Sequence, residues 1–195
     1  MLACDSCNVK LTHDAVTAGA SLEKRNNHGM SAFCLAAAQW KWPGHGHTEC
    51  MRILVKAGAD VNAGDAQVGY TPLHYAARNG STDLVYVLVT EMGANVNIKS
   101  NTGHTALTKA MEYCKMDTAR VLIENGADVT VVVTTDWEAC SPLSLACLHG
   151  DSATALLLLD KECDVSSVDR DGRTPLDWAL EKDMKDVENA IRAKL

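Results

Sequence analysis

Cysteine and histidine are the first side chains in this sequence whose types and spacing could hold a metal or carry redox chemistry. Cys4 and Cys7 form a Cys-x-x-Cys pair, which is typical of half a zinc site or of a redox-active dithiol. No second pair has matching spacing, and His45, His47 and Cys50 could complete a site only if that segment folded over the N-terminus. We therefore expect no metal and no cofactor, with Cys4 and Cys7 packed on the end of the fold. A redox- or metal-regulated adaptor is the alternative.

Catalytic motifs are the next question. Serine, histidine and aspartate are all present, but the Gly-x-Ser-x-Gly turn that exposes a nucleophile is not. The sequence also lacks a G-x-x-x-x-G-K-[ST] phosphate loop and a G-x-G-x-x-G stretch after a strand, which cradle nucleotides. The sequence therefore predicts a protein that is not an enzyme.

Composition narrows the partner class. Of 195 residues, 47% are apolar and 22% are charged, which is typical of a globular chain. The net charge of −7 comes without a lysine or arginine cluster, whereas nucleic acids and anionic membranes need basic residues to meet phosphates. The sequence has no run of 18 apolar residues, which is about the length that a helix needs to cross a bilayer. We therefore expect neither nucleic-acid binding nor direct membrane insertion.

Two short motifs return along the chain in the same order. Residues 69–77 read GYTPLHYAA, and residues 172–179 read GRTPLDWA. A closing motif appears at residues 58–62 as GADVN, at 93–97 as GANVN and at 126–130 as GADVT. The opening motif starts at residues 29, 69, 103, 139 and 172, so the period is about 33 residues once short insertions are allowed for. Such a period indicates a repeat array.

The motifs resemble the ankyrin repeat, whose pattern is G-x-T-P-L-H-x-A-A, then G-H, an apolar run and G-A-D-V-N. The resemblance covers nearly the whole chain. It implies an all-α ankyrin-repeat solenoid of helix-turn-helix units joined by β-hairpin loops. It also implies a surface that binds other proteins and no catalytic residues.

The repeat spacing predicts a single ankyrin-repeat domain over residues 1–195. Its parts are a degenerate N-terminal cap (1–25), a first repeat (26–62) with an insertion at 40–45, a second repeat (63–97), a third (98–130), a fourth (131–166) and a C-terminal capping repeat (167–195). Terminal repeats are expected to be atypical because they cover the exposed ends of a stack.

Local chemistry explains the motif residues. A threonine before proline is a plausible N-cap, and proline in the first helical turn loses no hydrogen bond. Gly58, Gly93 and Gly126 are expected to end the second helices in the left-handed conformation. The resemblance implies that His74 makes a hydrogen bond between repeats. Asn62 and Asn97 are expected to be structural turn residues, although the family also uses such asparagines as substrates for β-hydroxylation.

The eight cysteines bear on the compartment. Most of them fall on repeat positions where a small residue packs; Cys147, for example, takes the second alanine of the opening motif, and Cys163 the alanine of GAD. We expect these thiols to be small core residues in a reducing compartment. The N-terminus lacks a secretory signal, so the predicted location is intracellular and cytoplasmic. An organelle reached after presequence removal is the alternative.

The resemblance places partner contacts at the hairpin tips and on the inner, concave face of the first helices. The positions there that the fold leaves variable include aromatic and arginine residues, which are enriched at interface hot spots. The predicted contact residues are Tyr70, Arg78, Asn79, His104, Glu112, Tyr113, Trp137, Glu138, Leu148, His149, Arg170 and Arg173; the wider set adds Asn101, Thr102, Cys140, Asp171, Glu181 and Lys182. The predicted function is therefore a protein-binding module.

A second hypothesis is a structural or linker subunit of a larger assembly. It rests on Trp40 and Trp42 in the insertion and on the apolar start of the loop over residues 131–140. Residues two apart in an extended loop point to opposite sides, so one tryptophan can pack down while the other projects outward as an anchor. The alternative interpretation is that both rings lie flat on the first repeat and only shield its core.

Overall fold

The computed structural model of the chain describes residues 8–39, 45–134 and 139–195. The described residues form short helices, and a single strand pair of two residues a side. The chain divides into two compact units, residues 1–106 and 107–195. The predicted all-α, ankyrin-type fold class is confirmed, and each unit is described by itself.

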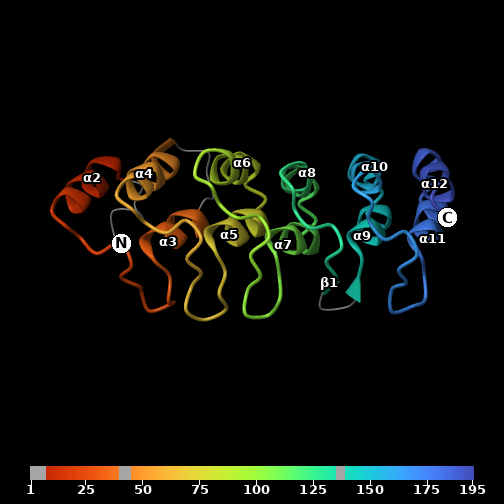
Figure 1. Cartoon of the computed structure of the whole chain (residues 1–195), viewed down its shortest axis with the longest axis horizontal. Helices are drawn as coiled ribbons and strands as arrows, with labels where there is room; N and C mark the ends of the chain where they lie inside the picture. Colours follow the sequence, from red (N-terminus) through yellow and green to blue (C-terminus); the bar gives the residue numbers. More distant parts are fainter. Residues whose placement is uncertain (1–7, 40–44, 135–138) are drawn as a thin grey trace. The chain divides into compact units, whose positions relative to one another are not determined.

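The first unit contains α2 (Val9–Thr17), α3 (Ala32–Ala38), α4 (His45–Lys56), α5 (Pro72–Asn79) and α6 (Thr82–Thr90). Helices α3 and α4, and α5 and α6, are the two helices of successive repeats and pack against each other. First helices also pack on first helices (α3 on α5), and second helices on second helices (α2 on α4), as Figure 1 shows. Because α4 begins at His45, that residue belongs to the helix and not to the predicted insertion.

The second unit contains α7 (Ala106–Glu112), which begins at the boundary, α8 (Met116–Glu124), α9 (Pro142–Leu148), α10 (Ser152–Asp160), α11 (Pro175–Glu181) and α12 (Lys185–Arg192). Here α9 packs on α10 and α11, while α10 also packs on α8 and α12. Strands β1 (Val133–Thr134) and β2 (Ala139–Cys140) pair antiparallel, with Val133 opposite Cys140, in the segment before α9. Cys140 is 4% exposed, so its prediction as a surface position is wrong.

Side-chain caps start the first helices as the motif predicts. Ser141 Oγ accepts the amide of Ser144, and Thr174 caps α11 together with Asp177. In α5, the amide and hydroxyl of Thr71 both lie within 3.1 Å of His74 Nδ1. His74 Nε2 lies 2.8 Å from the carbonyl oxygen of His104 in the next hairpin. A carbonyl only accepts, so Nε2 carries the proton and Nδ1 accepts, and the predicted bond between repeats is confirmed.

Glycines end the second helices. Gly58, Gly93 and Gly126 have φ of 94°, 73° and 86°, so the predicted left-handed conformation is confirmed. The amide that follows reaches back over the last turn, for example from Ala127 to the oxygen of Leu122 at 3.0 Å. The next turn is also tied to its neighbour, since Asn62 Oδ1 accepts the amide of Asn95 at 2.9 Å. This contact supports the structural interpretation of Asn62.

In four of the hairpins, one polar side chain anchors the turn by accepting backbone amides. Asn26 Oδ1 accepts the amides of His28 and Met30, and Ser100 Oγ accepts that of His104. The same position holds Asp65 in the second repeat and Asp169 in the fifth. These four hairpins thus have their own internal support, and the first helices that follow them begin at a fixed place.

Candidate protein-interaction surfaces

In the first unit, the predicted contact residues flank a buried hydrogen-bond network. Asp65 accepts the amides of Gln67, Val68 and Tyr70 and the hydroxyl of Tyr75 at 3.0 Å. Burial alone would raise the pKa of Asp65, but these hydrogen bonds together lower it below its usual value. Burial and the neighbouring carboxylate raise the pKa of the Tyr75 phenol.

Tyr70 lies on this network at the hairpin's edge. Its half-buried ring stacks on His74 with centroids 5.4 Å apart and meets Tyr75 edge-on at 5.8 Å. At the end of α5, Arg78 and Asn79 are exposed, and Asn79 Nδ2 donates to the oxygen of Ala38 at 3.0 Å. Asn79 therefore also joins two repeats.

In the second unit, the end of α7 presents Glu112 and Tyr113. Lys109 Nζ lies 2.6 Å from Glu112 Oε2, and the Lys109 side chain is only 7% exposed. The same ammonium lies 6.0 Å from the centre of the Tyr113 ring, within the outer range of a cation–π contact. Tyr113 itself is 41% exposed, so an aromatic side chain next to this ion pair faces solvent.

The ends of α7 and α9 meet through Cys114 and His149. Cys114 Sγ lies 3.2 Å from His149 Nε2, and both side chains are exposed. Cys114 has a φ of 53°, at the position where the second and fourth repeats have Gly80 and Gly150. This contact brings Tyr113 and His149, two predicted contact residues from different repeats, onto one patch. Leu148, next to His149, is half-buried.

The fifth repeat adds two arginines. Arg173 lies with its guanidinium carbon 4.4 Å from the centre of the Trp178 ring, and its Nη1 donates to Glu181 Oε2 at 2.7 Å. Arg170 is exposed on the hairpin. Trp178 Nε1 in turn donates to Asp169 at 2.9 Å, so the ring that supports Arg173 is itself fixed.

Several predicted residues lie outside the described part of the chain: Cys4, Cys7, Trp40, Trp42, Trp137 and Glu138. Of the other possible metal ligands, His47 is 7% exposed and Cys50 is fully buried, with the Thr12 hydroxyl donating to Cys50 Sγ at 3.3 Å. Burial lowers the pKa of His47. Within residues 8–39, 45–134 and 139–195, no three His, Cys, Asp or Glu side chains lie together as metal ligands would.

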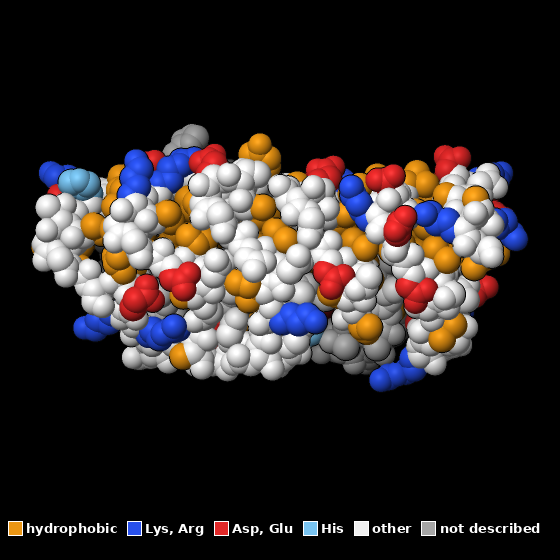
Figure 2. Space-filling view, viewed as in Figure 1, with side chains coloured by type: hydrophobic (Ala, Val, Ile, Leu, Met, Phe, Trp, Pro, Cys, Tyr) orange, Lys and Arg blue, Asp and Glu red, His pale blue; other side chains and the backbone are white. Residues whose placement is uncertain are grey.

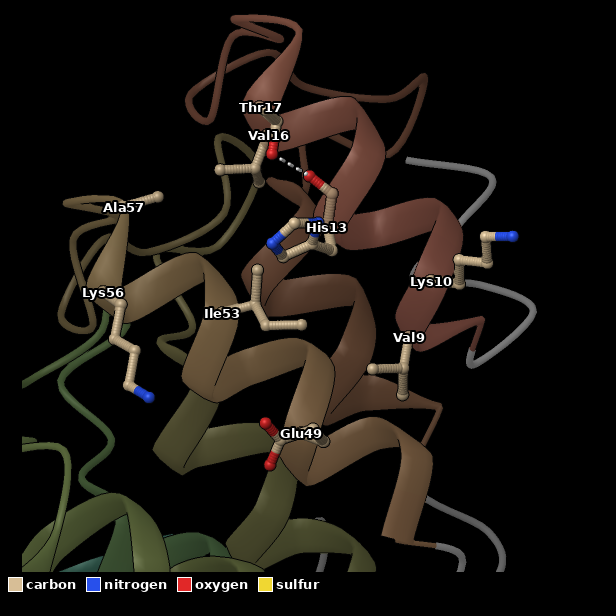
Figure 3. Close-up of a pocket in the computed structure, with 9 residues that line it drawn as sticks. All are labelled: Val9, Lys10, His13, Val16, Thr17, Glu49, Ile53, Lys56 and Ala57. Carbon is tan, nitrogen blue, oxygen red and sulfur yellow. Dashed lines mark hydrogen bonds between the residues drawn. The ribbon is translucent and has the colours of Figure 1, made fainter.

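A cleft between α2 and α4 was not predicted. It encloses about 820 Å³ and is lined by side chains at helical spacing on both walls (Figure 3): Val9, Lys10, His13, Val16 and Thr17 on α2, and Glu49, Ile53, Lys56 and Ala57 on α4. The sequence carried a usable signal, because each wall repeats at i, i+4 and i+7. The depth of the cleft depends on how far apart the helices lie, which spacing alone does not give.

Comparison of the sequence with known protein families gives a match. A family model described as "Ankyrin repeats (3 copies)" matches residues 1–100 and 66–133. The chain belongs to the ankyrin-repeat family. Ankyrin repeats generally mediate protein–protein interaction. None of the described helices of this ankyrin-repeat protein is long and apolar enough to cross a membrane.

The relatives of this ankyrin-repeat chain are larger proteins. It is 34% identical over 131 residues to the mouse B-cell lymphoma 3 protein homolog, covering 65% of the chain and 28% of the relative. It is 35% identical over 131 residues to putative ankyrin repeat protein FPV244 of Fowlpox virus, covering 66% and 18%. It is 33% identical over 123 residues to the NF-kappa-B inhibitor cactus of Drosophila melanogaster, covering 62% and 23%. The match spans less than a third of each of these relatives.

Proposed function

We propose that this protein is a non-catalytic interaction module that binds a protein partner through the concave face of its first helices and its hairpin tips. The patch around Tyr113 carries this proposal. An exposed tyrosine there is backed by the Lys109–Glu112 pair, and the contact between Cys114 and His149 joins it to the next repeat. Held aromatic side chains lose little conformational entropy on binding, which suits them as anchors.

The relatives support a partner of protein nature. One of them is named as an inhibitor of NF-kappa-B, and two others, from zebrafish and human, are named ankyrin repeat and SOCS box proteins. We place the protein inside the cell, in the cytoplasm, because five of its six described cysteines are buried as small core side chains.

Two tyrosine variants provide the test. Tyr113 on the first-helix surface and Tyr86 on α6 are both exposed, at 41% and 55%. The wild-type chain, Tyr113→Ala and Tyr86→Ala would each be used to capture partners from native extract, with quantitative mass spectrometry. We expect Tyr113→Ala to lose the specific partner about tenfold or more, and Tyr86→Ala to retain it. Equal retention by both variants would contradict the proposed surface.

A structural subunit of a larger assembly is the second candidate. Val132, in the loop over residues 131–140, is 64% exposed, as an apolar contact to a neighbouring subunit would require. Size exclusion of the purified chain separates the candidates. A structural subunit should self-associate or precipitate when isolated, whereas an adaptor should elute as a discrete species. Replacing residues 40–44 by a Gly-Ser link tests the tryptophan insertion without changing α4, since a loss of stability without a loss of binding would make the insertion only a lid.

A further inference from the structure

We propose that the α2–α4 cleft is a second docking site, which accepts a short amphipathic helix of a protein partner with an acidic side chain at each end of its apolar stripe. The site lies on second helices and does not use the surface of the proposed function.

The walls of the cleft suit a helix. Val9 and Val16 on α2 and Ile53 on α4 are aliphatic and only partly buried, although they line the space between two packed helices. A third helix can seat its side-chain ridge in such a groove, as amphipathic helices do in apolar grooves. The α2 wall runs from Val9 to Thr17, so at 1.5 Å per residue it is about 12 Å long. That length matches about two turns of a bound helix.

Charge determines what the ends of that helix must carry. Lys10 lies on α2 at the Val9 end, and Lys56 lies on α4 at the other end, where Val16 and Ala57 also lie (Figure 3). Figure 2 shows basic and histidine side chains with hydrophobic ones between them over this region. Of the side chains that the structure describes, none forms an ion pair with either lysine. The lining of the cleft therefore carries more positive than negative side chains, although the whole chain has a net charge of −7.

Glu49 is the one carboxylate among the lining residues, and it is already partly compensated. Its Oε2 lies 3.6 Å from Arg52 Nη1, and Arg52 also pairs with Glu91 at 2.7 Å. The lining therefore has a lysine at each end, with its ammonium group pointing outward from the space between the helices (Figure 3), and aliphatic surface between. The complement of this lining is a helix with two acidic residues about seven positions apart. Its apolar residues lie three and four positions after the first acidic residue, on the same face.

The test uses designed probes. An alanine-based helical peptide with a central leucine pair and glutamates seven residues apart is titrated into the full-length, ¹⁵N-labelled chain. A second peptide has lysines in place of the glutamates. The chain variants are Lys10→Glu/Lys56→Glu, and Lys161→Glu/Lys185→Glu as a matched charge reversal at exposed sites in the second unit. Circular dichroism verifies that each variant is folded.

We expect the acidic peptide to shift amide signals of α2 and α4, and the Lys10→Glu/Lys56→Glu variant to bind it at least tenfold more weakly while gaining affinity for the basic peptide. The control pair and Tyr113→Ala should bind as the wild type does. Shifts located elsewhere, no binding, or equal affinity in both double variants would overturn the proposal. A concentration-dependent dimer abolished by Ile53→Asp would assign the cleft to a second copy of the chain instead.

Discussion

The α2–α4 and α8–α10 pairs have the same place in the repeat, since both are neighbouring second helices, yet their outer surfaces differ. Between α8 and α10, Arg120 Nη1 lies 3.1 Å from both Asp151 Oδ2 and Thr154 Oγ1, while its Nη2 contacts Asp117. Between α2 and α4, the Thr12 hydroxyl meets Cys50 Sγ in the interior, and the described outer side chains form no ion pair from one helix to the other.

The fold specifies the inner contacts of these helix pairs but not the polar side chains on their outer side. The repeat fixes the inner contacts of the second helices through small and aliphatic residues. The outer side is set by a few polar residues. In the α8–α10 pair one arginine ties the two helices together, whereas the α2–α4 pair, with no such tie among its described side chains, has a cleft. We therefore interpret the arginine-tied surface of α8 and α10 as structural, and we propose the untied surface of α2 and α4 as a binding site.

Raising the pH should have the largest expected effect on stability. The cores of the two units should respond alike, although their outer surfaces differ. Burial raises the pKa of Cys34 in the first unit to about 11, and in the second unit that of Cys147 to about 12 and of Cys163 to about 11. Below pH 9 these thiols are neutral in both states, so their contribution to stability is complete. Above pH 9 the unfolded thiols ionise first, and stability is lost as the pH rises through the folded values.

The expected loss between pH 8 and pH 11 is on the order of a few kcal/mol, measured as the shift in urea midpoint. Cys34→Ala should lower stability at pH 8 and flatten the pH profile. A flat wild-type profile over this range would contradict the assignment of buried, neutral thiols.

Removal of the arginine tie is the next largest change. Arg120→Met should cost about 2 kcal/mol of unfolding free energy, because it leaves Asp151 and Thr154 without their shared donor. The charges of Arg120 and Asp151 are both partly shielded from water at this site. The matched variant Lys56→Met, in the cleft, should change stability by less than about 0.5 kcal/mol. Urea unfolding measures both. Equal costs would show that the two helix pairs do not differ as described.

Replacement of the glycines that end α4 and α8 should have the same effect on stability in both helix pairs. Gly58 follows α4 and Gly126 follows α8, both with positive φ and with no atom near the position of an added Cβ. Gly58→Ala and Gly126→Ala should each cost about 1 kcal/mol, from conformation alone. Denaturant melts with no change at either site would refute the left-handed assignment there.

Removal of the exposed tyrosines should have the smallest effect on stability. Tyr86→Ala and Tyr113→Ala should each shift the unfolding free energy by about 0.5 kcal/mol or less, because both rings face solvent. A much larger loss for Tyr113→Ala, seen in the same urea melts, would show that its ring is mainly a packing residue. That result would weaken the proposal that it serves as a binding anchor.

Features with local causes could be predicted from the sequence. Proline at the start of a helix, a serine or threonine cap and a glycine at its end act within a few residues, and the structure confirms them. The bond from His74 followed from the family resemblance. The Cys114–His149 contact could not be predicted, because it joins residues 35 apart whose distance depends on how two repeats pack. An aligned repeat shows only that Cys114 stands where glycine is usual.

The same limit explains the candidate surfaces. Exposure of variable positions follows from the repeat pattern, but their partners do not: Asn79 bonds to the oxygen of Ala38, and Glu112 pairs with Lys109. The cleft depends on the separation of α2 and α4, which is a property of packing. The side chains that could line it were nevertheless visible as helical stripes in the sequence.

Hydrogen–deuterium exchange of the full chain, alone and with the captured partner, tests the central claim most directly. The patch at the ends of α7 and α9 is proposed to be covered by the partner. We predict slower exchange in residues 112–115 and 148–151 on binding, and unchanged exchange in the second helices α8 and α10. Protection confined to α8 and α10, or no change at the ends of α7 and α9, would contradict the account.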